Sequence, residues 1–138
     1  KGAPLVTGGT ADNASMPATI LDHVTSDMRA YHEESFGPVI SIIRIKDDEQ
    51  ALFVANDTEY GLSASVFSQN FPRAMKIAKK IESGICHINS ATVNGEAQAP
   101  YGGTKSTGYG RFDGRAVIDE FTELRWLTVA PNQVHYPF

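Results

Sequence analysis

The alternation of apolar and polar positions predicts several short strands in the first two thirds of the chain. Thr19 to Val24 and Val39 to Ile45 are the first two candidates. The second is nearly all apolar and β-branched, which is typical of a strand that is buried on both faces. A further strand is expected at Leu62 to Phe67, where apolar and polar residues alternate, and another at Ile85 to Asn89, after the glycine that ends the preceding helix.

The two segments that connect these later strands carry helix start signals. Asp47 precedes Gln50 by three residues, a spacing typical of a capping box, and the helix should run to about Asn56. Asn70 can cap a second helix, with Pro72 in its first turn, where a missing N–H costs little. The apolar residues of this second helix recur at helical spacing: Phe71, Ala74, Met75, Ala78 and Ile81.

The resulting order of strand, helix, strand, helix, strand predicts an α/β fold. Two successive βαβ crossovers should build one parallel sheet, with ligands bound outside the carboxyl ends of its strands. The long loop from Ser90 to Gly110 starts at such an end, and loops of this length are usually functional or disordered. A short helix is expected around Gly114 to Asp119. Phe121 to Val129 should then form a final strand that needs another chain as its partner.

Composition and charge exclude several classes of protein. With 41% hydrophobic and 20% charged residues, the 138-residue chain has the composition of a soluble globular domain. The net charge of −4 and the lack of a basic block argue against nucleic acid as a partner, and no apolar run has membrane-spanning length. Cys86 is the only cysteine, which fits a reducing compartment, so we expect a cytoplasmic protein. The histidines show no metal-site spacing.

The run "YGGTKSTGYGR", Tyr101 to Arg111, holds four glycines and a lysine. A phosphate-binding P-loop needs glycine directly before the lysine, but here Thr104 precedes Lys105. The spacing of the glycines does not fit the G-x-G-x-x-G dinucleotide fingerprint either. We therefore interpret the run as a tight loop whose glycines allow backbones to approach closely.

Two adjacent carboxylates, Glu33 and Glu34, stand directly before Phe36 and the buried strand. In an extended segment they cannot face the same site. One of them could accept hydrogen bonds from the two hydroxyls of a ribose, as a carboxylate does in dinucleotide sites. The alternative is a solvated acidic turn.

The third expected strand carries Cys86 and His87 side by side. A free cysteine inside an apolar strand usually behaves as a small hydrophobic residue. His87 points to the opposite face, so the two residues do not form a nucleophile–base pair. Asn89 ends the strand, where its side chain could organise the following loop. Glu96, in that loop, could serve as an acid or base, although solvated loop carboxylates are commoner.

Three motifs taken together resemble the C-terminal part of NAD(P)-dependent aldehyde dehydrogenases. They are E-E-x-F-G-P, N-D-T-E-Y-G-L and P-x-G-G-x-K-x-[ST]-G-x-G-R, and the resemblance extends over about residues 2–129. It implies the second half of a catalytic domain in residues 1–120, followed by an oligomerisation strand and tail in residues 121–138. The chain begins with Lys1-Gly2, a pair with which many helices end, so we expect a piece of a longer protein.

The resemblance also implies roles for individual residues. Glu34 would hydrogen-bond the nicotinamide ribose of NAD or NADP, and Phe36 would pack beside it. Tyr101 would line the substrate tunnel, whose wall the loop Asn89–Pro100 helps to form. The nucleophilic cysteine, the general-base glutamate and the oxyanion asparagine would lie upstream, so we assign no catalytic residue and expect the chain alone to be inactive.

Within the glycine-rich run, the resemblance assigns structural rather than chemical roles. Gly102 and Gly103 would be required by the backbone, and Lys105 would be structural. The stretches "GICHIN", "EAQAPYGG" and "HYPF" look most like dehydrogenases for aromatic aldehydes of the salicylaldehyde, vanillin and benzaldehyde type. The departure at "NSATVNGEAQ" leaves the exact aldehyde open.

The predicted protein is therefore a homo-oligomer, a dimer or a tetramer, that pairs through the last strand and acts on a small aldehyde. Two alternatives remain open at this point. One is a non-catalytic assembly module that uses the same strand and binds no cofactor. The other is a nonoxidative acyl-transfer or phosphate-dependent relative with the same fold.

Overall fold

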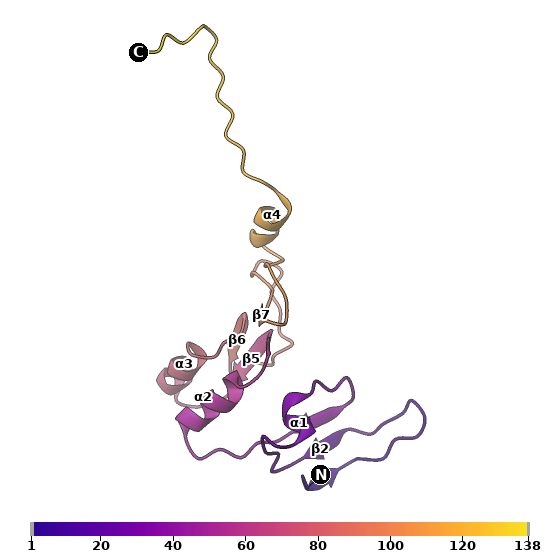
Figure 1. Cartoon of the computed structure of the whole chain (residues 1–138). Coiled ribbons are helices and arrows are strands. Elements are labelled where there is room, and N and C mark those ends of the chain that lie inside the picture. Colours follow the sequence, from indigo (N-terminus) through magenta and orange to yellow (C-terminus); the bar gives the residue numbers. More distant parts are fainter. Residues whose placement is uncertain (1, 138) are drawn as a thin grey trace.

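The computed structural model describes residues 2–137, and these form three small sheets and four helices. Lys1 and Phe138, with which the two expected domains begin and end, lie outside the described residues. Figure 1 shows an elongated arrangement in which the first sheet lies at one end and the C-terminal segment extends from the other. Within the described range, no helix is long and apolar enough to cross a membrane.

The first sheet has the order β1-β2-β3, formed by Leu5–Thr7, Thr19–Leu21 and Val39–Ser41. β1 runs antiparallel to β2, whereas β2 and β3 are parallel, with Thr19 opposite Val39. The expected strands at Thr19 and Val39 are confirmed, but both are shorter than expected. Ile40 is 63% exposed, so the expectation that β3 is buried on both faces is wrong for these residues.

A buried threonine fixes the start of β2. The Thr19 hydroxyl accepts a hydrogen bond from the Gly9 amide (3.0 Å) and donates one to the Pro17 carbonyl (2.9 Å). Its own amide donates to the Pro38 carbonyl (2.8 Å), directly before β3. Because the hydroxyl and the amide of Thr19 both have hydrogen-bond partners, burying them costs little. The chain on either side of β2 is thereby tied to the segment that leads into β3.

The far end of the same sheet is held by an ion pair. Arg44 donates from Nε and Nη2 to the two carboxylate oxygens of Asp22, at 2.9 and 2.6 Å. Hydrogen bonding by Arg44 lowers the pKa of Asp22 from 3.8 to about 2. The pair joins the residue that follows β2 to the chain that follows β3.

The middle of the chain forms α2 (Asp48–Asn56), β5 (Ser63–Val66), α3 (Phe71–Ala78) and β6 (Ile85–Ile88). Both predicted caps are confirmed: Asp47 accepts from the Gln50 amide at 2.8 Å and Asn70 from the Arg73 amide at 3.0 Å. β5 and β6 pair in parallel across α3, as the second βαβ unit predicts. Ala74 of α3 is fully buried against this pair.

The prediction of one continuous parallel sheet is wrong for the described residues. β3 pairs with β2 and not with β5, so the segment that contains α2 leads from one sheet to another. The expectation assumed that a crossover helix returns the chain to the sheet it left. Local sequence determines that a helix follows β3, but the neighbour of a strand depends on the rest of the fold.

The glycine-rich run docks on the middle of the chain through β4 (Tyr60–Gly61) and β7 (Thr104–Lys105), which pair antiparallel. Gly61 is held further by the Thr107 hydroxyl, which accepts from its amide at 2.7 Å. Two of the motifs that carry the family resemblance, N-D-T-E-Y-G-L and the glycine run, are therefore direct structural partners.

Close backbone contacts explain the glycines of the run. A Cβ on Gly84 would overlap the carbonyl oxygen of Gly102, and a Cβ on Gly103 would overlap the Thr107 side chain. A Cβ on Gly102 would lie 2.7 Å from the carbonyl oxygen of Gly110. The prediction that Gly102 and Gly103 serve the backbone is confirmed.

The C-terminal part contains α4 (Ala116–Phe121) and then a long extended segment. Residues 122–137 form no helix and no strand, and each is exposed. In Figure 1 this segment, coloured yellow, runs away from the rest of the chain. The expected strand at Phe121 to Val129 therefore has no partner among the described residues, and Phe121 itself ends α4. A strand needs hydrogen bonds from a neighbour, and here none is available.

The chain buries little apolar surface. Only Val24 and Ala74 qualify as buried hydrophobic residues within the described range. The accessible surface is 11182 Å², whereas a folded monomer of 15.0 kDa exposes about 7,000 Å². About a third of the exposed surface is thus in excess of what a self-contained domain of this size has.

We predict that Gly84→Ala is strongly destabilising, whereas Gly95→Ala is neutral. Neither glycine has a positive φ, so backbone strain does not separate them. The new methyl group at 84 meets backbone that cannot move aside, which we expect to cost about 3 kcal/mol. Gly95 has no atom within 4 Å of the corresponding position. Thermal unfolding of both variants measures the difference, and equal melting temperatures would contradict the close contact between Gly84 and Gly102.

Candidate functional site

Glu34 and Phe36 lie on the loop between α1 (Arg29–His32) and β3. Phe36 is 96% exposed, and Glu34 is also exposed. Within residues 2–137 the Glu34 carboxylate has no hydrogen bond and no ion pair. A carboxylate and an aromatic ring two residues apart are therefore both free to contact a ligand.

The short helix before this loop is fixed by all four of its residues. Arg29 donates to the Glu33 carboxylate (2.7 Å), and the Ala30 carbonyl accepts from the Ser41 hydroxyl (3.1 Å). The Tyr31 hydroxyl donates to Asp57 (2.8 Å), and His32 Nε2 bonds the Ser26 carbonyl (2.7 Å). Burial and the bond to Asp57 raise the pKa of Tyr31, so its hydroxyl remains the donor. The helix that precedes Glu34 is thus held by hydrogen bonds to several other segments of the chain.

The other end of the loop is held by the bond between the Thr19 amide and the Pro38 carbonyl. Glu34 and Phe36 consequently lie beside the amino ends of β2 and β3, which begin at Thr19 and Val39. The general rule for parallel sheets points to the carboxyl ends. Reasoning from that rule alone would have missed this loop. The two adjacent carboxylates and the E-E-x-F-G-P motif pointed to it.

Tyr101 lies at the start of the glycine-rich run. Its backbone exchanges two hydrogen bonds of 2.7 Å with Phe112, so its position is fixed, and 43% of the residue is exposed. No hydrogen bond or ring contact within the described residues joins Tyr101 to Glu34 or Phe36. In Figure 1 the loop near β7 and the loop beside α1 belong to different parts of the chain. The structure therefore brings Glu34 and Phe36 together but keeps Tyr101 apart from them.

Lys105 connects the glycine run to the end of α2. Its ammonium group donates to the carbonyl oxygens of Asn56 (2.8 Å) and Thr58 (3.1 Å) and lies 2.9 Å from the Glu82 carboxylate. A cation at a helix C-terminus satisfies carbonyls that the helix leaves unpaired. The prediction that Lys105 is structural is confirmed.

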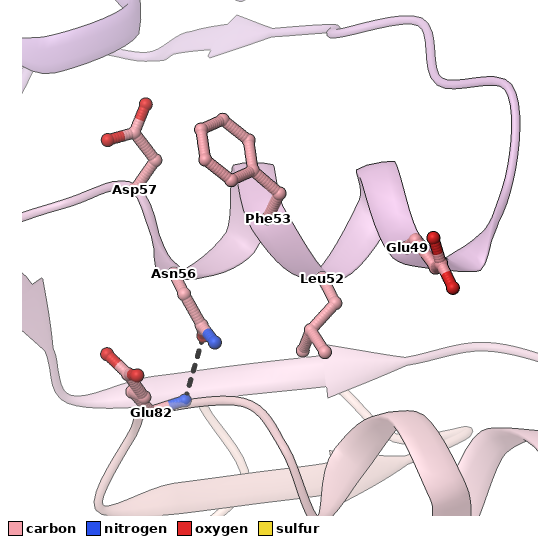
Figure 2. Close-up of a pocket in the computed structure, with 6 residues that line it drawn as sticks. All are labelled: Glu49, Leu52, Phe53, Asn56, Asp57 and Glu82. Atoms are coloured by element: carbon pink, nitrogen blue, oxygen red, sulfur yellow. Dashed lines mark hydrogen bonds between the residues drawn. The ribbon is translucent and has the colours of Figure 1, made fainter.

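Asn56 is a structural residue that our reasoning from local patterns missed. Figure 2 shows its side chain directed at the backbone of Glu82, whose amide donates to Asn56 Oδ1 at 2.9 Å. The Asn56 amide nitrogen donates to the Lys80 carbonyl at 3.0 Å. The signal was present in the N-D-T-E-Y-G-L motif, in which an asparagine ends the predicted helix.

A hollow of about 440 Å³ adjoins α2, and Figure 2 labels the residues that line it. Its lining residues are Glu49, Leu52, Phe53, Asn56, Asp57 and Glu82. None of the predicted site residues is among them. The acidic side chains stand apart in Figure 2, and no cluster of three potential metal ligands exists in the described part of the chain. We therefore do not assign the site to this hollow.

The carboxyl ends of β5 and β6 are tied together by Asn89. Its side-chain amide accepts from the Ser68 amide (2.8 Å) and donates to the Ser68 carbonyl (3.0 Å). The side chain thus imitates one further pair of a β ladder. Asn89 holds the chain that follows β5, and not the loop after β6 for which a role was expected. Nearby, burial raises the pKa of Cys86, and His87 Nε2 is buried without a hydrogen-bond partner among residues 2–137.

Comparison with known proteins gives a consistent result. The aldehyde dehydrogenase family matches residues 1–127. A salicylaldehyde dehydrogenase of Pseudomonas putida is 61% identical over 138 residues, which is 100% of this chain and 29% of that protein. The chain thus spans less than a third of the length of this relative.

Two solved structures are similar to the whole arrangement. A salicylaldehyde dehydrogenase from Pseudomonas putida G7 complexed with salicylaldehyde has a TM-score of 0.92 at 61% identity, covering 99% of this chain and 28% of that one. A Mycobacterium tuberculosis aldehyde dehydrogenase complexed with NAD+ has a TM-score of 0.82 at 35% identity, covering 88% of this chain and 26% of that one.

Proposed function

This chain belongs to the aldehyde dehydrogenase family, and we propose that the protein carrying it oxidises an aromatic aldehyde to the carboxylic acid with NAD or NADP as hydride acceptor. The observation that carries this proposal is the 61% identity, along the entire chain, to a relative named for salicylaldehyde. The mixed α/β arrangement, similar to two solved members of the family, supports the same assignment.

In this proposal the aldehyde carbon is attacked by a cysteine thiolate, loses a hydride and becomes a thioester that water hydrolyses. The attacking cysteine lies outside this chain. Cys86 is the only cysteine here, it is half-buried on β6, and burial raises its pKa, so its thiol stays protonated. The isolated chain is accordingly inactive as a dehydrogenase.

We place the chain in the second half of the catalytic domain, residues 1–120, followed by an oligomerisation segment, residues 121–138. The excess of exposed surface supports this, because it is the surface that further polypeptide would cover. The separate sheets agree with it as well, since β3 and β5 each have an edge to which strands from elsewhere could be added.

The residues at Glu34 and Phe36 fit a nicotinamide coenzyme. A carboxylate without a partner among the described residues can accept hydrogen bonds from both hydroxyls of a ribose. An exposed aromatic ring can pack against the flat nicotinamide ring that this ribose carries. When bound, the coenzyme supplies the hydride acceptor. Glu34 would fix the sugar and thereby the position of the ring that it carries.

Tyr101 fits the aldehyde side of the reaction. Its ring is partly exposed and its backbone is held by Phe112, so it can offer a fixed aromatic face to a flat substrate. An aromatic aldehyde would gain from this face, whereas a short aliphatic one would gain little.

The exposed C-terminal segment favours a role in assembly. Its large apolar side chains stand free, with Leu124, Trp126, Leu127 and Val129 each more than 70% exposed. A non-catalytic assembly module would show the same feature, and catalysis by the full-length protein separates that alternative from the proposed enzyme.

We expect Glu34→Gln in the full-length protein to raise the KM for the coenzyme about tenfold, because a charge-assisted hydrogen bond to the ribose is lost. The KM for the aldehyde should change little. Steady-state kinetics with NAD and NADP measure both values. Glu49→Gln is the matched control, since Glu49 is an exposed carboxylate on α2 without a bonded partner. Equal coenzyme KM values in the two variants would refute the role of Glu34.

The full-length protein should oxidise benzaldehydes with a higher kcat/KM than short aliphatic aldehydes. Tyr101→Ala should lower kcat/KM for benzaldehydes about fivefold, because the stacking face is lost, and should affect propanal less. Tyr101→Phe keeps the ring and serves as control. A uniform loss on both substrate classes would mean that Tyr101 supports the fold and not the substrate.

Removal of residues 122–138 from the full-length protein should lower the number of subunits in its assembly. The truncated protein would lack the strand that pairs with a second copy. Light scattering of the parent and the truncated protein gives the two masses. An unchanged mass would count against an oligomerisation role for this segment.

A further inference from the structure

The proposed coenzyme site contains two neighbouring carboxylates of identical chemistry, Glu33 and Glu34. Only one carboxylate is needed to hold a ribose diol. A second free carboxylate beside it would add negative charge close to a coenzyme that itself carries anionic phosphates. Charges a few ångströms apart are not fully screened at physiological ionic strength, where the Debye length is about 8 Å. The site therefore benefits if a cation pairs with one of the two carboxylates and neutralises its charge.

Arg29 forms an ion pair with Glu33, the first of the two carboxylates. Its guanidinium donates from Nε to Oε1 and from Nη2 to Oε2, both at 2.7 Å, in a two-pronged arrangement. The Glu33 amide also donates to the Arg29 carbonyl at 2.9 Å, so the two residues are joined through backbone and side chains. The bond to Glu33 raises the pKa of Arg29, which keeps its positive charge.

This pairing distinguishes the two glutamates. Glu33 follows α1 with φ −87° and ψ 133°, and its carboxylate is held by Arg29. The Glu34 carboxylate has no such partner within the described residues. Glu34 is therefore the carboxylate of the two that is available to a ligand.

We propose that Arg29 is a positioning residue for the coenzyme site, which withdraws the Glu33 carboxylate so that Glu34 alone meets the ribose. The proposal rests on the proposed function of Glu34 as the diol ligand. Arg29 does not touch the coenzyme. It acts by neutralising the neighbouring charge and by fixing which of the two glutamates faces the site.

The exposure of the pair makes this role separable from a role in folding. The side chains of Arg29 and Glu33 are 75% and 54% exposed, and ion pairs with such exposure contribute little to stability. Loss of the pair should therefore alter coenzyme binding without unfolding the protein. The chain offers a matched control in Arg44, which forms a similar two-pronged pair with Asp22 at the far end of the same sheet.

The test uses the full-length protein with Arg29→Gln, Arg29→Gln/Glu33→Gln and Arg44→Gln. In the first variant the KM for the coenzyme should rise about fivefold, because an uncompensated charge appears beside the site, while kcat stays within about twofold. The rise should shrink between low and high salt. In the double variant KM should return close to the parent value, since the competing carboxylate is gone. Arg44→Gln should leave KM unchanged.

Two results would overturn the proposal. One is an unchanged coenzyme KM in Arg29→Gln. The other is a double variant that binds coenzyme as weakly as Arg29→Gln at every salt concentration, because that pattern belongs to a purely structural contact. If Arg29→Gln lowers the melting temperature, the Glu33→Gln variant replaces it as the test. The coenzyme KM of Glu33→Gln should not rise. A rise would overturn the proposal, because it would show that Glu33 itself binds the coenzyme.

Failure of the proposed function gives a different pattern. If Glu34 does not hold the ribose, Glu34→Gln binds the coenzyme normally whatever the Arg29 variants do. If Glu34→Gln weakens binding and Arg29→Gln does not, the diol contact stands and only the positioning role of Arg29 is lost.

Discussion

The ammonium group of Lys105 lies where α2 ends, within hydrogen-bond distance of two carbonyl oxygens that the helix itself cannot pair. That one cation, together with the Asn56 amide beside it, joins three segments far apart in the sequence: the end of α2, the chain before β6 and the glycine-rich run. A helix C-terminus carries a partial negative charge, so a lysine is electrostatically suited to this position. The location of the loop that carries Tyr101 depends on this contact and on the close approach of Gly84 and Gly102.

The parts of the fold that could be predicted from sequence are those determined by neighbouring residues. Asp47 and Asn70 determine where α2 and α3 begin, because a side-chain oxygen has to satisfy an amide three residues on. The strands at Thr19 and Ile85 follow from short segments rich in apolar residues, and the strand at Ser63 follows from the alternation of polar and apolar residues. The pairing of β3 with β2, and the failure of the last segment to form a strand, could not be predicted, because a strand's partner lies outside its own sequence.

The candidate site shows the same division. Reasoning from residue chemistry reached the pair Glu33 and Glu34 but could not choose between them, since both are carboxylates in one short stretch. The choice of Glu34 came from the family resemblance and stays a prediction. In the structure Arg29 bonds Glu33, and Glu34 is exposed. The role of Lys105 also came from the resemblance, whereas Asn56 at the end of α2 escaped a search for local patterns because its partners are 24 and 26 residues away.

Residues 91–99 stand between two rigid anchors, the Asn89 amide on one side and the bridge between Tyr101 and Phe112 on the other. Every one of these nine residues is exposed. The segment is tied to its surroundings at two points, because the Ser63 hydroxyl donates to the Thr92 carbonyl at 2.9 Å and the Gly114 amide donates to the Ala97 carbonyl at 3.0 Å. Residues 93–96, between these two contacts, can therefore change in sequence while the framework on both sides keeps its geometry.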